Sequence, residues 1–165
     1  MKIALVLVAI VAAIIVVLAL AFFAYGRERS WALIAGSPDR GRLTLATQKR
    51  SPTANDAVAC TQGLREDCEI PLPAFDETPA NLNERLAGQI EARDPLARRV
   101  DDGKAPDHLR YITYSPTMRF PDLINIEFVE MDDGRTGIIA YARAQLGKLD
   151  FGANRARLER YFEGL

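Results

Sequence analysis

The chain has 165 residues, with 21 Lys and Arg against 22 Asp and Glu, so its formal net charge is −1 at pH 7. This balance excludes a generic nucleic-acid-binding protein, which needs a basic surplus to neutralise phosphates. Hydrophobic residues make up 48% of the chain and are concentrated at its start. We therefore expect one membrane segment followed by one globular domain.

The first predicted element is a transmembrane helix. Every residue from Ile3 to Tyr25 is apolar, and a helix of this length crosses a hydrocarbon core of about 30 Å. A cleaved signal peptide is the alternative, because Ala19-Leu20-Ala21 would serve as a cleavage site. However, the apolar run exceeds the usual signal-peptide core of about 7–15 residues, and Phe22 and Phe23 are typical of interfacial anchors. Residues 1–25 are therefore predicted to be a retained anchor.

The orientation of this anchor has two interpretations. The positive-inside rule places the domain in the cytoplasm, because Lys2 precedes the segment whereas four arginines follow it closely. An N-terminal Lys followed at once by a long apolar run instead resembles an uncleaved secretory signal, and long domains translocate largely regardless of charge. We expect an exported domain.

Residues 26–57 are predicted to form a mostly irregular, basic juxtamembrane linker with six Lys and Arg. Two roles are open for it: attraction to anionic headgroups, at about 1 kcal/mol per basic residue near a charged surface, or a solvated spacer. Within it, Trp31–Ile34 is a short apolar patch suited to the membrane interface. Arg42–Thr47 alternates polar and apolar side chains, which predicts a short edge strand.

Residues 58–165 are predicted to form an α+β domain. Leu82, Leu86 and Ile90 recur at a spacing of four after a Thr78-Pro79 helix start, and β-favouring or alternating residues follow in three runs. The expected elements are a helix over 79–93, strands over 109–115, 123–131 and 137–146, with a hairpin turn at 132–135, and a helix over 153–162. The predicted fold is a small antiparallel sheet packed against two helices, preceded by a single transmembrane helix.

The chain contains two cysteines and one histidine. Cys60 and Cys68 are the only cysteines, and in an exported domain a disulfide between them is the expected state. The single His108 has no recognisable nucleophile motif near it and is predicted to lie in a surface loop. Too few ligands are present for a metal site, no phosphate-binding glycine loop appears, and we expect no cofactor.

Three segments resemble the DUF1499 family, a domain of unknown function. They are Arg119-Phe-Pro-Asp122, Ile138–Arg143 and Leu146–Arg157, and the last contains Gly147, Asp150, Gly152, Asn154, Arg155 and Arg157 at the family's closing motif. The stretch Asn55–Cys60 resembles the family's start, so the resemblance covers about residues 50–165. It implies a compact domain, often behind a membrane anchor or export signal in bacteria, and no activity. We therefore expect a bacterial inner-membrane protein with a periplasmic C-terminal domain.

The closing motif has two interpretations. Asp150 and Gly152 before the last helix are typical of a helix start, with Arg155 reaching back to an acidic strand residue. Alternatively, Arg119, Arg143 and Arg155 converge with Asn154 and the helix amino terminus on an anionic ligand.

The aromatic side chains of the domain are also open to two interpretations. They either pack as plain core or line a cavity for an amphiphile, and the residues concerned are Tyr111, Tyr114, Phe120, Phe128 and Tyr141.

Two functions follow. The first is a non-catalytic accessory or structural subunit that docks on a larger membrane complex, with small residues of the anchor (Ala12, Ala13, Ala19, Ala21) permitting close helix contact. The second is a membrane-anchored binding module for a lipid or other anionic amphiphile. The expected partners are the bilayer, other membrane subunits and an anionic lipid, with no nucleic acid. An enzyme ranks third, because no nucleophile or base can be named.

Overall fold

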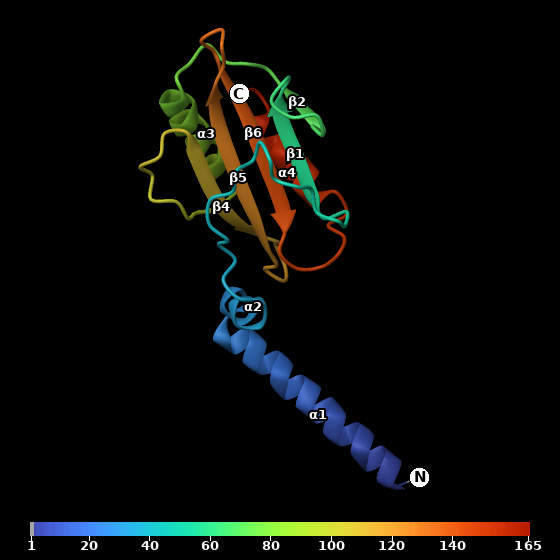
Figure 1. The fold of residues 1–165 in the computed structure, drawn as a ribbon. Helices are drawn as coiled ribbons and strands as arrows, with labels where there is room; N and C mark the ends of the chain where they lie inside the picture. Colours follow the sequence, from blue (N-terminus) through green and yellow to red (C-terminus); the bar gives the residue numbers. More distant parts are fainter. Residues whose placement is uncertain (1) are drawn as a thin grey trace.

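The structure is a computed structural model that describes residues 2–165 (Figure 1). Its elements are α1 (Lys2–Tyr25), α2 (Arg27–Ala35), β1 (Asp56–Thr61), β2 (Ile70–Leu72), α3 (Pro79–Arg93), β3 (Arg98–Arg99), β4 (His108–Tyr114), β5 (Pro121–Glu130), β6 (Thr136–Ala144) and α4 (Ala153–Phe162). The predicted α+β fold is confirmed, and the two domain helices have the predicted bounds. α1 is long and apolar enough to cross a membrane, and a signal sequence has the same properties.

The sheet has six strands in the order β2-β1-β6-β5-β4-β3. All neighbours are antiparallel except β1 and β2, which are parallel, so the sheet is larger than predicted and mixed. Parallel neighbours usually need a long crossover. Here a short return suffices because β2 has only three residues, and the expected disulfide between Cys60 and Cys68 is present in this return, with 5.7 Å between the Cα atoms.

One face of the sheet is covered by α3 and α4. Leu82, Leu86 and Ile90 of α3 are fully buried there, and so are Leu158 and Tyr161 of α4. The spacing of these residues places them on one side of each helix, which is why burial of an apolar stripe fixes both helices on the sheet.

The other face is covered by the chain that precedes β1, so the packed domain starts before residue 58 (Figure 1). Leu45 is fully buried, and the strand predicted at 42–47 is wrong. This segment crosses the face instead of extending an edge, and its backbone N–H groups bond to side chains. Leu43 N donates to Asn125 Oδ1 (3.3 Å), and Leu45 N donates to Glu127 Oε2 (3.1 Å).

The same covering segment buries His108, so the prediction of a surface loop for it is wrong. His108 opens β4 and is only 2% exposed, with Nε2 3.2 Å from Asn125 Oδ1. Burial lowers the pKa of His108, although its bond to Asn125 opposes the shift.

The linker also contains a helix that attaches α1 to the domain. The Trp31 side chain of α2 donates from Nε1 to Met118 O (2.8 Å), and its ring lies 4.8 Å from that of Phe120. Ser30 Oγ in turn donates to Phe22 O at the end of α1 (3.1 Å). We call the end of the sheet nearest α1, formed by the loops over 115–120 and 145–152, the proximal end (Figure 1).

Candidate functional site

An open hollow of about 610 Å³ lies at the proximal end, between the turn after α3, the β4–β5 loop and α4. Its charged lining consists of four arginines and one aspartate: Arg93, Arg119, Arg157, Arg160 and Asp94. Its remaining lining is Pro95, Leu96, Tyr114, Pro116, Ala153 and Ala156. The hollow therefore combines a positive charge excess with a largely apolar wall.

The floor of the hollow is a buried polar network centred on Arg157. Its Nη1 forms an ion pair with Asp122 Oδ2 (2.9 Å) and donates to Asn154 Oδ1 (2.6 Å), and the residue is 9% exposed. Burial raises the pKa of Asp122, and the adjacent Arg157 partly opposes this shift. The network thus keeps a carboxylate and a guanidinium out of water in direct contact.

Asp94 is also part of the network, because its Oδ2 lies 4.0 Å from Arg157 Nε. Its Oδ2 accepts bonds from Thr113 Oγ1 (2.7 Å) and Tyr161 OH (2.5 Å). Burial alone would raise the pKa of Asp94, but these two bonds and the backbone N–H of Leu96 hold it below its usual value. Burial and the bond to Asp94 raise the pKa of Tyr161. Asp94 and Tyr161 therefore hold each other in place by this hydrogen bond.

The rim of the hollow carries two more arginines, Arg119 and Arg160. Arg119 adopts a left-handed backbone conformation with φ 59°, and its Nη1 is buried without a hydrogen-bond partner among residues 2–165. Its Nε lies 3.9 Å from Glu28 Oε1 of α2. Arg160 is half exposed, with Nη2 3.8 Å from Asp94 Oδ2. These two guanidinium groups retain donors for an anion.

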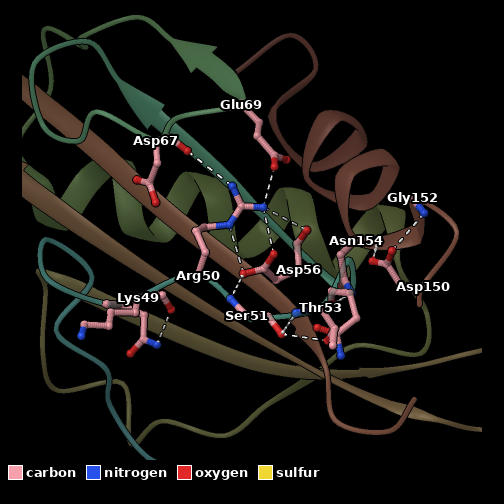
Figure 2. Close-up of polar contacts among 12 residues, drawn as sticks. Lys49, Arg50, Ser51, Thr53, Asp56, Asp67, Glu69, Asp150, Gly152 and Asn154 are labelled. Atoms are coloured by element: carbon pink, nitrogen blue, oxygen red, sulfur yellow. Dashed lines mark hydrogen bonds and ion pairs between the residues drawn. The ribbon is translucent and has the colours of Figure 1, made fainter. Parts of the chain in front are cut away.

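The predicted start of the last helix is observed. Asp150 Oδ1 accepts from Gly152 N and Oδ2 accepts from Asn154 N, both at 3.0 Å (Figure 2). Gly152 has φ 78°, a conformation that favours glycine. Asn154 is fully buried and donates from Nδ2 to Asn55 O (3.3 Å). These residues hold the helix in place.

The arginines predicted to converge are separated in the structure. Arg119 lines the hollow, but Arg143 projects from β6 toward the other face, where it lines a hollow with Arg40 and Tyr141. Arg155 points outward and pairs with Glu159 on its own helix (3.0 Å), so it does not reach an acidic strand residue as predicted. Arg157 makes the contact with an acidic strand residue, namely Asp122 of β5.

Three of the arginines that line the hollow were therefore not identified from the sequence as candidates for anion binding. These are Arg93, Arg157 and Arg160. A pattern could have found two of them. Asn154, Arg157 and Tyr161 follow each other at spacings of three and four and share the inner side of α4, and Arg160 lies three residues after Arg157. Arg155 is two residues before Arg157 and therefore faces away from it.

Other clusters have structural roles. Arg50 of the linker bonds to both carboxylate oxygens of Asp56 (3.0 and 2.8 Å) and to Glu69, which ties the linker to β1 and β2 (Figure 2). Although burial opposes it, the bond from Arg50 holds the pKa of Asp56 below its usual value. Residues 2–165 contain no group of three or more His, Cys, Asp or Glu able to hold a metal ion.

The aromatic side chains weighed as a cavity lining do not share one space. Tyr111 and Phe128 are core on the helix-covered face, whereas Tyr141 is core on the opposite face. Phe120 stacks on Trp31, and Tyr114 alone of the five lines the hollow.

Comparison with known proteins gives one match. A family model described as "Protein of unknown function (DUF1499)" matches residues 45–165. No match was found among curated proteins or among solved structures.

Proposed function

The chain belongs to the DUF1499 family, whose function is unknown, and from this premise we propose that it is a non-catalytic, membrane-anchored binding module for an anionic amphiphile. The ligand class is a lipid, or a similar molecule, with a phosphate or carboxylate headgroup. The headgroup binds Arg119 and Arg160 at the rim of the hollow, and the apolar part lies along its wall.

One observation carries this proposal: the hollow has four arginines against one aspartate, and Arg119 has a buried Nη1 without a partner. A buried donor without an acceptor is unfavourable unless a ligand or water satisfies it. Guanidinium groups form short, paired hydrogen bonds with phosphate and carboxylate. The position of the hollow at the end of the domain nearest α1 favours a membrane-derived ligand.

The proposal includes retention of α1 as a single-pass anchor in a bacterial inner membrane, with the domain in the periplasm. Support comes from the length and apolarity of α1 and from the disulfide, because disulfides persist in oxidising compartments. The contacts of Trp31 with Met118 and Phe120 add to this support, since they join the helix that follows α1 to the domain.

A binding role is favoured over catalysis by the groups that line the hollow. Besides arginines, its titratable lining residues are Asp94 and Tyr114. Asp94 is occupied by Thr113 and Tyr161, and burial raises the pKa of Tyr114. Neither group is poised to transfer a proton near neutral pH.

The test is lipid binding by the full chain in mild detergent, measured by native mass spectrometry with phosphatidylglycerol as the probe. We expect the double variant Arg119→Gln, Arg160→Gln to bind it at least about tenfold more weakly, because two charge-assisted hydrogen bonds are lost. Arg155→Gln is the matched control on α4 outside the hollow and should change affinity less than about twofold.

Two further probes complete the design. Phosphatidylcholine, which is neutral overall, should bind all variants weakly. Free glycerol phosphate carries the anion without the acyl chains, so its affinity distinguishes a site for an amphiphile from a site for the anion alone. Equal affinity of the double variant and the wild type for phosphatidylglycerol would refute the role of the hollow.

A second candidate is the accessory subunit of a larger membrane complex. The observation that favours it is that α1 has no buried residue and presents Ala12, Ala13 and Ala19 for close packing with another helix. The same mass spectra, recorded on protein extracted from its native membrane, test this role. A stoichiometric set of other membrane proteins would support it, whereas a single chain with bound lipid would support the binding module.

A further inference from the structure

Among the described residues outside α1, the exposed large hydrophobic side chains lie only in α2 and in the loops of the proximal end. Five large hydrophobic residues are exposed there: Leu33, Ile34, Phe120, Leu149 and Phe151. The first two belong to α2, and the other three belong to the loops of the proximal end. Apolar residues scattered singly over a surface are ordinary, but their confinement to one end is typical of an interaction surface.

Phe151 is the most exposed of these side chains. It is 95% exposed and has a left-handed backbone conformation, φ 54°, which is unusual for a residue other than glycine. Asp150, just before it, accepts hydrogen bonds from the backbone N–H groups of Gly152 and Asn154, just after it. The loop is thus held in a conformation that keeps an aromatic ring outside the core.

The loop that carries Phe151 is also fixed to the domain. Asn55 donates from Nδ2 to Gly147 O (2.8 Å), and Asp150 N donates to Ala54 O (3.2 Å). Two exposed residues, Lys148 and Leu149, stand beside Phe151. A basic residue next to exposed apolar side chains is the composition of segments that lie in an anionic membrane surface.

The bilayer is the partner that this surface fits, because α2, which carries Leu33 and Ile34, directly follows α1 in the chain. On α2, Trp31 and Arg27 face the domain, where Trp31 bonds to Met118 and Arg27 bonds to Thr117. Arg29, Leu33 and Ile34 of the same helix are exposed. The loop after β6 lies at the end of the sheet from which the chain runs back to α1 (Figure 1).

We propose that the proximal end docks on the bilayer surface, with Leu149 and Phe151 inserted at the interface beside Leu33 and Ile34 of α2. This inference rests on the retained anchor of the proposed function, but it does not depend on the arginine-lined hollow. It assigns the domain a fixed orientation, in which the hollow opens next to the headgroups.

The test uses the full chain in phosphatidylglycerol-containing proteoliposomes. Because the chain has a single tryptophan, subtraction of the wild-type signal isolates the fluorescence of an indole added by Phe151→Trp. We expect at least twofold quenching of this added signal by lipids brominated near the carbonyl. We also expect at least threefold less quenching by iodide than for Asp132→Trp, the matched control in the exposed hairpin at the opposite end of the sheet.

Leu149→Trp provides a second reporter and should give the same result as Phe151→Trp. Iodide quenching equal to that of Asp132→Trp at both positions would overturn the docking surface. Flotation separates this failure from failure of the anchor, because loss of all variants from the vesicles would show that α1 is not retained and would overturn both proposals. If the hollow proved to have no preference for anionic lipid, neither the quenching nor the flotation result would change, so the two proposals can fail separately.

Discussion

Arg157 and Arg155 are two residues apart and have opposite surroundings. Arg157 is 9% exposed and contacts Asp122 and Asn154 inside the domain, whereas Arg155 pairs with Glu159 on the surface. Two helical residues in this relation point about 200° apart, given 3.6 residues per turn. The position of each charge relative to water decides how much it contributes to stability.

We predict that Arg157→Met lowers the free energy of unfolding by about 3 kcal/mol, because the buried carboxylate of Asp122 is left without its partner. Arg155→Met is the matched control and should cost less than about 0.5 kcal/mol, since its exposed pair is screened. Chemical denaturation of the full chain in mild detergent, followed by near-ultraviolet circular dichroism, measures both. Equal costs for the two variants would contradict this account.

A double variant separates the buried charge from the lost packing. Replacing Asp122 with Asn in the Arg157→Met background removes the uncompensated charge and should recover part of the lost stability. No recovery would mean that packing around Arg157, and not the charge of Asp122, accounts for the cost.

At the scale of elements, local patterns predicted those parts of the fold whose determinants are close in sequence. Thr78 accepts a bond from Asn81 N at the start of α3, as its position before a proline indicates. The strands β4, β5 and β6 contain β-favouring residues, and the hairpin at 132–135 joins the last two. Within such segments, helix capping and hydrophobic spacing are sufficient to predict the secondary structure.

Elements that depend on distant partners were not predictable in this way. Residues 42–47 do alternate polar and apolar side chains, as a strand would. However, the backbone N–H groups of this segment bind the side chains of Asn125 and Glu127, which lie 82 residues further along the chain, and not a neighbouring strand. The strand β2 also depends on a partner, because its three residues pair with β1, which lies 11 positions earlier in the chain. The hollow has the same origin, since Asp94, Arg119 and Arg157 come from three separate elements.

The disulfide stabilises the parallel strand pair by closing its return loop. Cys60 and Cys68 are separated by 8 positions, and closure of so short a loop contributes about 2–3 kcal/mol by restricting the unfolded chain. We predict a loss of that size in the free energy of unfolding for the double variant Cys60→Ala, Cys68→Ala, measured by denaturant titration. Wild-type protein in reductant should show a similar loss, and identical stability with and without reductant would contradict the prediction.

At the scale of the whole molecule, three features meet at the proximal end: the attachment of α2 through Trp31, the arginine-lined hollow and the exposed loop with Phe151. In contrast, the end with the 132–135 hairpin exposes polar side chains. Under the proposed docking, the proximal end contacts the membrane and the opposite end contacts water. This polarity links the fold to the proposed function, because the proposed docking would let a ligand enter the hollow from the headgroup layer.

Acid stability tests the packing of the linker over the sheet, because it reports on the only histidine of the chain. Burial lowers the pKa of His108 below its usual value of 6.5, so the folded state binds a proton there less readily than the unfolded chain. The stability due to neutral His108 is complete above pH 6.5 and is lost as the pH falls through the lowered pKa. The aspartates with lowered pKa values, such as Asp94, contribute a further loss only below about their usual value of 3.8.

We therefore predict that the free energy of unfolding falls in two stages, the first as the pH drops below 6.5 and the second below pH 3.8. His108→Gln should flatten the first stage, because glutamine has no proton to gain, and should leave the second stage in place. Urea titrations at intervals from pH 8 to pH 3 measure both stages. If the variant and the wild type lost stability in parallel between pH 6.5 and 3.8, the first stage would have another origin, and His108 would not be kept from water as its burial indicates.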